Sequence, residues 1–131
     1  MYMQIAIKDE TASGKTFDVM SLIFNTKFIT VRDVITERVT QEVAIYNRKL
    51  SGVFNGLVQP THAEVSLNGY KMKAATPIDA NKQIDIAIEA FSRNRYFILV
   101  DDKQADSLDD EIVLADTTVI SFVKLTPLVG G

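Results

Sequence analysis

The chain has 131 residues, of which 47% are apolar and 24% are charged, and this is enough apolar material for one compact domain. A formal net charge of -3 argues against general binding to nucleic-acid phosphates. The absence of cysteine excludes disulfides, thiol nucleophiles and thiolate metal sites, and a single histidine, His62, excludes sites built from paired imidazoles. No apolar run is long enough to cross a membrane, and residues 1–8 lack the apolar core of a signal peptide. We therefore expect a cytoplasmic protein that is not an enzyme, holds no metal, and binds neither nucleic acid nor membranes.

The first 24 residues predict a β-hairpin. Residues 3–8 alternate between apolar and polar, residues 17–24 form a second strand-like run, and the polar residues 9–16 join them. The motif Ser-Gly-Lys-Thr at residues 13–16 imitates the end of a phosphate-binding loop, but a strand follows it where such a loop needs a helix. A hairpin turn is therefore the expected structure there.

A long helix is predicted from Val31 to Asn47. Thr30 and Asp33 have the spacing of a capping box, which satisfies two main-chain amides at a helix start. Apolar residues recur every fourth position along the segment, which is typical of a helix with one buried face. The charged residues are expected on the opposite, exposed face: Arg32, Glu37, Arg38 and Glu42.

The middle of the chain predicts a second hairpin and a second helix. Asn68-Gly69 separates two short runs within residues 64–73, and Asn-Gly favours a two-residue turn because both residues tolerate positive φ. The second helix should be capped by Asp79 and end near Arg93 or Asn94. Its expected apolar face consists of Ile84, Ala87, Ile88 and Phe91.

The last third predicts two central strands joined by an acidic connector. Residues 96–100 and 118–125 are apolar on both strand faces over much of their length, as central strands are. The connector lacks the residue spacing of a calcium-binding loop, so its carboxylates are expected in solvent. Such a surface would suit docking of a basic partner. We define the acidic surface as these residues: Asp101, Asp102, Asp106, Asp109, Asp110 and Glu111.

The C-terminal residues 127–131 are expected to form a flexible tail after a domain that spans residues 1–126. Pro127 has no amide hydrogen, so the last strand should leave the sheet there. Gly130 and Gly131 have no side chains and could enter a narrow channel, and a terminal carboxylate is ionised at neutral pH and can attack the α-phosphorus of ATP. The product of that attack would be an acyl adenylate.

The order of these elements resembles that of ubiquitin. The resemblance is carried by the first hairpin, by the helix from Val31, and by residues 96–131, which end in Leu128-Val129-Gly130-Gly131. It implies an α+β fold of the β-grasp class, in which a mixed sheet wraps a central helix. Residues 50–95 have no counterpart in ubiquitin and are read as an insertion containing a hairpin and a second helix. The combination also resembles the enlarged ubiquitin-like proteins of bacterial operons that encode activating, conjugating and peptidase partners.

The resemblance implies a protein modifier. An E1-like enzyme would adenylate Gly131, consuming ATP and Mg²⁺ without leaving a cofactor on this chain, and an E2-like enzyme would pass the acyl group to target proteins. A deconjugating peptidase would be the fourth partner. The resemblance further implies that Leu128 and Val129 seat in an apolar groove of a partner, while Pro127 sets the direction of the tail.

Two other functions remain open from the sequence. The ThiS-like and MoaD-like sulfur carriers also end in Gly-Gly on a β-grasp domain, and their adenylate is converted to a thiocarboxylate. Alternatively, the chain is a β-grasp interaction module whose glycines have no chemical role, in which case deletion of Gly130 and Gly131 would leave its activity intact.

Overall fold

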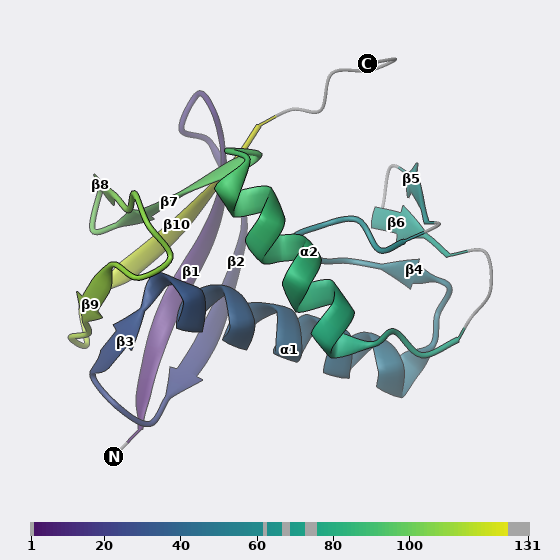
Figure 1. Cartoon of the computed structure of the whole chain (residues 1–131), viewed down its shortest axis with the longest axis horizontal. Helices are drawn as coiled ribbons and strands as arrows, with labels where there is room; N and C mark the ends of the chain where they lie inside the picture. Colours follow the sequence, from purple (N-terminus) through teal and green to yellow (C-terminus); the bar gives the residue numbers. More distant parts are fainter. Residues whose placement is uncertain (1, 62, 67–68, 73–75, 126–131) are drawn as a thin grey trace. The chain divides into compact units, whose positions relative to one another are not determined.

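The computed structural model describes residues 2–61, 63–66, 69–72 and 76–125, and within them the chain is an α+β protein with a mixed five-stranded sheet and two helices (Figure 1). Its contacts divide the chain into two compact units. Unit 1 comprises Met1–Asp33 and Phe91–Gly131, and unit 2 is Val34–Ala90. Unit 2 is therefore continuous in sequence, whereas unit 1 is assembled from two separate segments.

Unit 1 contains the five-stranded sheet, whose strand order is β2-β1-β10-β7-β8 (Figure 1). The strands are β1 (Met3–Thr11), β2 (Thr16–Phe24), β7 (Tyr96–Val100), β8 (Lys103–Gln104) and β10 (Val119–Lys124). The strands β1 and β10 run parallel, with Ala6 opposite Val119, and the other neighbouring pairs are antiparallel. The predicted first hairpin is confirmed, and both predicted central strands have a neighbour on each side.

One face of this sheet is buried, because successive side chains of a strand point to opposite faces and the side chains on this face are mostly large and apolar. The rings of Tyr96 and Phe122 lie 5.9 Å apart on that face, and aromatic pairs at this separation add to the stabilisation from burial alone. The buried residues come from four of the five strands: Met3, Ile5, Ile7, Leu22, Phe24, Tyr96, Ile98, Ile120 and Phe122.

Two further strands of unit 1 pair with each other just before the first helix begins. Strand β3 (Phe28–Thr30) pairs antiparallel with β9 (Glu111–Val113), and α1 (Val31–Lys49) follows β3 directly. The predicted capping box is present: the amide of Thr30 donates to Asp33 Oδ2 at 2.9 Å, and the amide of Asp33 donates to Thr30 Oγ1 at 3.2 Å. The helix thus begins where the sequence predicts and extends two residues further, to Lys49.

Unit 2 contains most of α1, a small antiparallel sheet and all but the last two residues of the helix α2 (Ala80–Ser92). The small sheet has the order β4-β6-β5, formed by β4 (Val53–Phe54), β5 (Glu64–Ser66) and β6 (Gly69–Lys71). The predicted second hairpin is confirmed as the pairing of β5 with β6, although Asn68 itself lies outside the described residues. Gly69 has a φ of 136°, and a Cβ there would lie 2.7 Å from the main-chain oxygen of Phe54, so this position requires glycine.

One prediction for α1 is wrong. Arg38 and Glu42 were expected in solvent, but they are only 1% and 8% exposed and lie within the buried stripe of the helix. Arg38 Nε donates to Glu42 Oε2 at 3.1 Å, one helical turn away. Because each charge neutralises the other, the pair satisfies the condition under which charged side chains are buried. Of the other two residues predicted on the exposed face, Arg32 is exposed and Glu37 is half-buried.

The second helix begins at the predicted cap. Asp79 Oδ1 accepts hydrogen bonds from the amides of Asn81 at 2.9 Å and Lys82 at 3.3 Å. Ala87 and Phe91 are buried as predicted, whereas Ile84 and Ile88 are half-buried. The helix ends at Ser92, just before the predicted end.

Candidate functional site

The predicted conjugation tail, residues 127–131, lies outside the described residues, as does His62. This covers Gly131 as the site of adenylation and the four predicted recognition residues, Pro127, Leu128, Val129 and Gly130. What the structure does describe is β10, the strand that leads toward the tail and ends at Lys124.

The end of β10 is held by charges as well as by main-chain pairing. Lys124 Nζ lies 3.4 Å from Asp9 Oδ2 on β1 and 5.7 Å from the centre of the Phe17 ring. Asp9 is 4% exposed, so this ion pair is shielded from solvent on one side. Three residues earlier on β10, the Ser121 hydroxyl donates to Glu10 Oε1 at 3.2 Å. The last described strand is thus fixed to β1 as far as Lys124.

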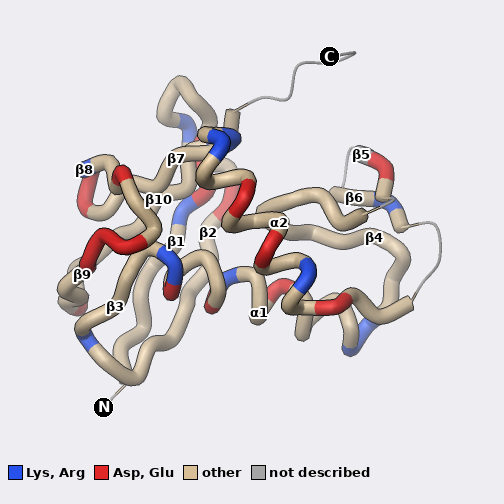
Figure 2. The backbone as a smooth tube through the Cα atoms, in the orientation of Figure 1, with Lys and Arg blue, Asp and Glu red and all other residues tan. Residues whose placement is uncertain are grey.

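The six residues of the acidic surface all lie in unit 1, in the segment from the end of β7 to the first residue of β9 (Figure 2). Asp101 and Asp102 form the turn between β7 and β8 and have φ values of 49° and 70°, a conformation that aspartate tolerates. Asp101 Oδ1 also accepts a hydrogen bond from the amide of Val119 at 2.9 Å, which connects this turn to β10.

Asp110 holds a second turn of the same segment. Its Oδ2 accepts hydrogen bonds from the amides of Asp106 at 2.9 Å and Ser107 at 3.2 Å. Asp106, Asp109 and Glu111 are exposed. The acidic surface therefore contains two kinds of carboxylate, with Asp101 and Asp110 bonded to the main chain and the others presented to solvent.

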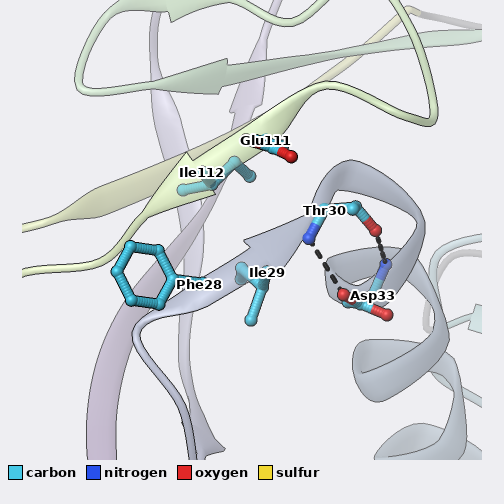
Figure 3. Close-up of a pocket in the computed structure, with 6 residues that line it drawn as sticks. All are labelled: Phe28, Ile29, Thr30, Asp33, Glu111 and Ile112. Carbon is cyan, nitrogen blue, oxygen red and sulfur yellow. Dashed lines mark hydrogen bonds between the residues drawn. The ribbon is translucent and has the colours of Figure 1, made fainter.

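A pocket of about 260 Å³ lies beside this segment, where β3, β9 and the first turn of α1 meet (Figure 3). Ile29 and Ile112 stand opposite each other in the strand register and are buried, whereas Phe28 is 65% exposed. Two carboxylates, those of Asp33 and Glu111, also line the pocket. Apolar walls beside carboxylates suit an apolar side chain that carries or adjoins a positive charge.

A second pocket, of about 290 Å³, includes Asp106 and Asp109 among its lining residues. Arg32 lines it as well, so its charge is mixed, in contrast to that of the pocket at Glu111. The acidic residues thus border two depressions of unit 1 with different electrostatic character.

Sequence reasoning missed the apolar rim of the first pocket. Phe28 and Val113 are paired across β3 and β9, and each is 65% exposed. The three residues before α1, Phe28, Ile29 and Thr30, could have predicted the exposure of Phe28. In a strand their side chains alternate between the two faces, which places Ile29 inward and Phe28 outward. The pairing partner on β9 could not be read from the sequence.

Unit 2 contains a polar cluster around Glu42 that the sequence also did not reveal. Glu42 Oε1 accepts a hydrogen bond from the amide of Leu57 at 3.0 Å while Oε2 accepts from Arg38. Burial raises the pKa of the Tyr70 phenol above its ordinary value of 10.0, and the nearby charge of Glu42 raises it further. Tyr46 is 4% exposed, and its ring meets Phe54 edge-on at 5.8 Å. This cluster is part of the interior of unit 2.

The remaining features considered in the sequence analysis are the phosphate-loop-like motif, metal ligands and membrane-spanning helices. Gly14, with φ 90°, lies in the hairpin turn that the phosphate-loop-like motif was expected to form, and its amide donates to Thr11 O at 2.9 Å. Among the described residues, no group of His, Asp or Glu side chains is placed to hold a metal ion. None of the described helices has the length and apolar character needed to cross a membrane.

Comparison of this chain with protein-family models, curated proteins and solved structures found no match.

Proposed function

We propose that this chain is a ubiquitin-like protein modifier with a β-grasp fold, and that an E1-like enzyme activates the carboxylate of Gly131. The carboxylate would be available at the end of the sequence given or after a peptidase has removed any residues that follow. Gly130 and Gly131 would enter the enzyme's active site, with Leu128 and Val129 in an apolar groove.

One observation carries the proposal: β1 and β10 are parallel neighbours near the middle of a mixed sheet in the order β2-β1-β10-β7-β8. A β-grasp sheet is built in this way, with the first and last strands parallel and antiparallel strands on both sides. The arrangement supports the role of β10 as the strand that leads to the tail, since the ion pair between Lys124 and Asp9 fixes the end of this strand to β1.

The proposed chemistry needs nothing from this chain beyond a presented carboxylate. One carboxylate oxygen of Gly131 attacks the α-phosphorus of ATP, the new bond forms an acyl adenylate, and pyrophosphate leaves. A thiolate of the activating enzyme then attacks the acyl carbon, the thioester forms, and AMP leaves. The chain is a substrate in both steps.

The globular part would supply recognition of the activating enzyme. The exposed carboxylate of Glu111 lines a pocket together with the exposed ring of Phe28, and the exposed carboxylates of Asp106 and Asp109 line a second pocket of the same unit. We propose that a basic and apolar segment of the activating enzyme docks there, since charge complementarity raises association rates and an apolar anchor slows dissociation.

The test is intact mass spectrometry of the chain after incubation with its cognate E1-like enzyme, ATP and Mg²⁺. We expect an adenylate or an enzyme-bound acyl product with the whole chain and none with a variant lacking Gly130 and Gly131. A matched control, Gly14→Ala, changes a glycine in the β1–β2 turn and leaves the tail intact, so it should still be activated.

The outcomes separate the three functions. Transfer of the acyl group to a protein amine supports the modifier, whereas conversion of the adenylate to a thiocarboxylate would assign the chain to sulfur transfer. With an enzyme shown to be active on another substrate, the lack of any tail-dependent product would leave the interaction module.

A further inference from the structure

The turn that joins β1 to β2 carries an exposed aromatic residue beside an exposed positive charge. Lys15 is exposed, and the Phe17 side chain two residues later is 52% exposed. Within residues 11–17, Thr-Ala-Ser-Gly-Lys-Thr-Phe, Lys15 is the only charged residue. We call Lys15 and Phe17 the hairpin tip. It presents to solvent a cation with an apolar group next to it.

Local contacts hold the backbone and the ring of the hairpin tip. The amide of Lys15 donates to Thr11 Oγ1 at 3.1 Å, and the amide of Thr11 donates to the Lys15 carbonyl at 2.9 Å. Lys124 Nζ lies 5.7 Å from the centre of the Phe17 ring. The neighbouring carboxylate of Asp18 accepts a hydrogen bond from the next amide in the chain at 2.9 Å. A tip ordered in this way loses less conformational freedom when it binds a partner.

The pocket at β3 and β9 has the complementary chemistry (Figure 3). Phe28, which is 65% exposed, forms an apolar wall, and the carboxylates of Asp33 and Glu111 line the same pocket. Asp33 is occupied in part by the helix cap, whereas Glu111 is exposed. Lys27 Nζ lies 5.2 Å from the centre of the Phe28 ring and offsets part of the negative charge. With two carboxylates against one ammonium group, the charge around the pocket remains negative.

One copy cannot bring its own hairpin tip to its own pocket. In the ladder of β1 with β2, Thr16 lies at one end and Phe24 at the other. Strand β3 follows soon after Phe24, so the pocket lies toward the second end of the ladder, whereas the hairpin tip is at the first (Figure 1). A strand as long as β2 spans roughly 30 Å. The tip can therefore reach only the pocket of another molecule.

We propose that the hairpin tip of a second copy docks in this pocket, with Phe17 against Phe28 and Lys15 beside the carboxylates of Asp33 and Glu111. The contact would cover an exposed aromatic ring on each molecule and bring a cation to a negatively charged pocket. A second copy is the chosen occupant because the chain itself carries the apolar and basic segment that the pocket suits. Each copy has its tip and its pocket at opposite ends, so the contact joins copies head to tail.

This contact would regulate the proposed activation. The pocket is among those assigned above to the activating enzyme, so copies joined head to tail would have covered docking sites, and the enzyme would engage dissociated chains. This consequence rests on the proposed function, whereas the contact between copies does not. Because the contact is small, we expect a dissociation constant of roughly 0.1 to 1 mM. Dilution would then release chains for activation.

Sedimentation of the whole chain, without any enzyme, measures the contact. Over roughly 10 µM to 1 mM we expect an average mass that rises with concentration and rises less at high salt. Lys15→Glu and Glu111→Lys should each weaken association about tenfold, because each brings like charges together. Lys103→Glu and Asp109→Lys are the matched controls, since they make the same charge changes at exposed positions of unit 1 outside the tip and the pocket. They should alter association by less than about twofold.

The decisive variant combines Lys15→Glu with Glu111→Lys in one chain. It keeps the parent's net charge and restores opposite charges across the contact, so its association should return to within about threefold of the parent's. A mixture gives a second test of the head-to-tail arrangement. Phe17→Ser chains keep an intact pocket and Glu111→Lys chains keep an intact tip, so mixing them should give two-chain complexes that neither forms alone.

The proposal is overturned if the chain stays monomeric throughout this concentration range. It is also overturned if the controls weaken association as much as Lys15→Glu and Glu111→Lys do, or if the combined variant associates no better than the single ones. Circular dichroism checks the fold of each variant, which the exposed positions should preserve. Activation without self-association would refute this inference alone, and self-association without activation would refute the proposed function alone.

Discussion

Two ion pairs, one in each unit, show how differently charge is used in the two parts of the molecule. In unit 2, Arg38 and Glu42 lie 3.1 Å apart with side chains only 2% and 8% exposed. In unit 1, Lys124 and Asp9 lie 3.4 Å apart, with the lysine 27% and the aspartate 5% exposed. The first pair lies within one helix, whereas the second connects two strands that are far apart in the sequence.

The difference teaches that the pair in which both charges are buried is local, within one helix, whereas the pair that connects distant segments keeps its lysine partly exposed. A pair spaced by four residues on a helix is already positioned when the helix forms, so little further ordering is needed. The pair between β1 and β10 exists only when the whole sheet of unit 1 has assembled. Removing one partner from each pair should therefore have unequal effects.

The largest effect is expected for Arg38→Met. The substitution leaves the Glu42 carboxylate buried without its guanidinium, which costs about 3–5 kcal/mol in comparable buried pairs. Urea unfolding followed by circular dichroism measures the loss. The double variant Arg38→Met with Glu42→Gln keeps an acceptor for the Leu57 amide and removes the charge, so it should be clearly more stable than Arg38→Met. Equal stability of the two would contradict the buried-charge argument.

A smaller effect is expected for Lys124→Met, about 1–2 kcal/mol, because the lysine is 27% exposed and keeps part of its hydration in the pair, although the Asp9 carboxylate that it leaves is buried. The measurement is again urea unfolding of the whole chain followed by circular dichroism. Lys124→Arg is the matched control, since it keeps a cation near Asp9 and the Phe17 ring, and it should lose much less.

The acidic surface offers a similar contrast within one segment. Asp110→Ala should destabilise the chain by about 1 kcal/mol, because the carboxylate accepts two main-chain hydrogen bonds. Asp109→Ala changes an exposed residue and should stay within about 0.5 kcal/mol of the parent. Thermal unfolding of the two variants under identical conditions gives the comparison, and equal melting temperatures would show that the turn does not need Asp110.

If the acidic surface steers the activating enzyme, Asp106→Asn with Asp109→Asn should lower the association rate several-fold at low salt without lowering stability. Stopped-flow binding at two ionic strengths is the measurement, and the effect should shrink at the higher one. An unchanged rate would remove the steering role and leave the proposed activation itself untouched.

The last prediction concerns the stability of the folded chain at alkaline pH, and no change is expected at neutral pH. The raised pKa of Tyr70 means that the unfolded chain releases its phenol proton before the folded chain does. The stability contributed by Tyr70 is therefore complete below about pH 10 and falls as the pH rises from there through the higher folded pKa. Tyr70→Phe should flatten this alkaline decline in urea unfolding, whereas Tyr2→Phe, at a position 79% exposed, should leave it as in the parent.

Much of the local structure could be predicted from the sequence because its signals are local. The Thr30 and Asp33 capping box, the Asp79 cap and the alternation in β1 and β2 each depend on residues within a few positions of one another. The burial of Arg38 and Glu42 was missed because a hydrophobic pattern treats any charged residue as exposed, even when its partner lies one turn away. The parallel pairing of β1 with β10 and the pairing of Phe28 with Val113 depend on long-range contacts that no local pattern contains.

That parallel pairing has a consequence for how the protein forms. Glu10 and Ser121, which are bonded across β1 and β10, are 111 residues apart in the sequence. Contacts at such separation slow folding because a long loop must close before any stabilisation is gained. During synthesis, the continuous unit 2 leaves the ribosome before β10 does, so its helices can form first. The β1–β2 hairpin must wait with one side unpaired until β10 emerges, and this delay is when the chain is most exposed to aggregation and to chaperones.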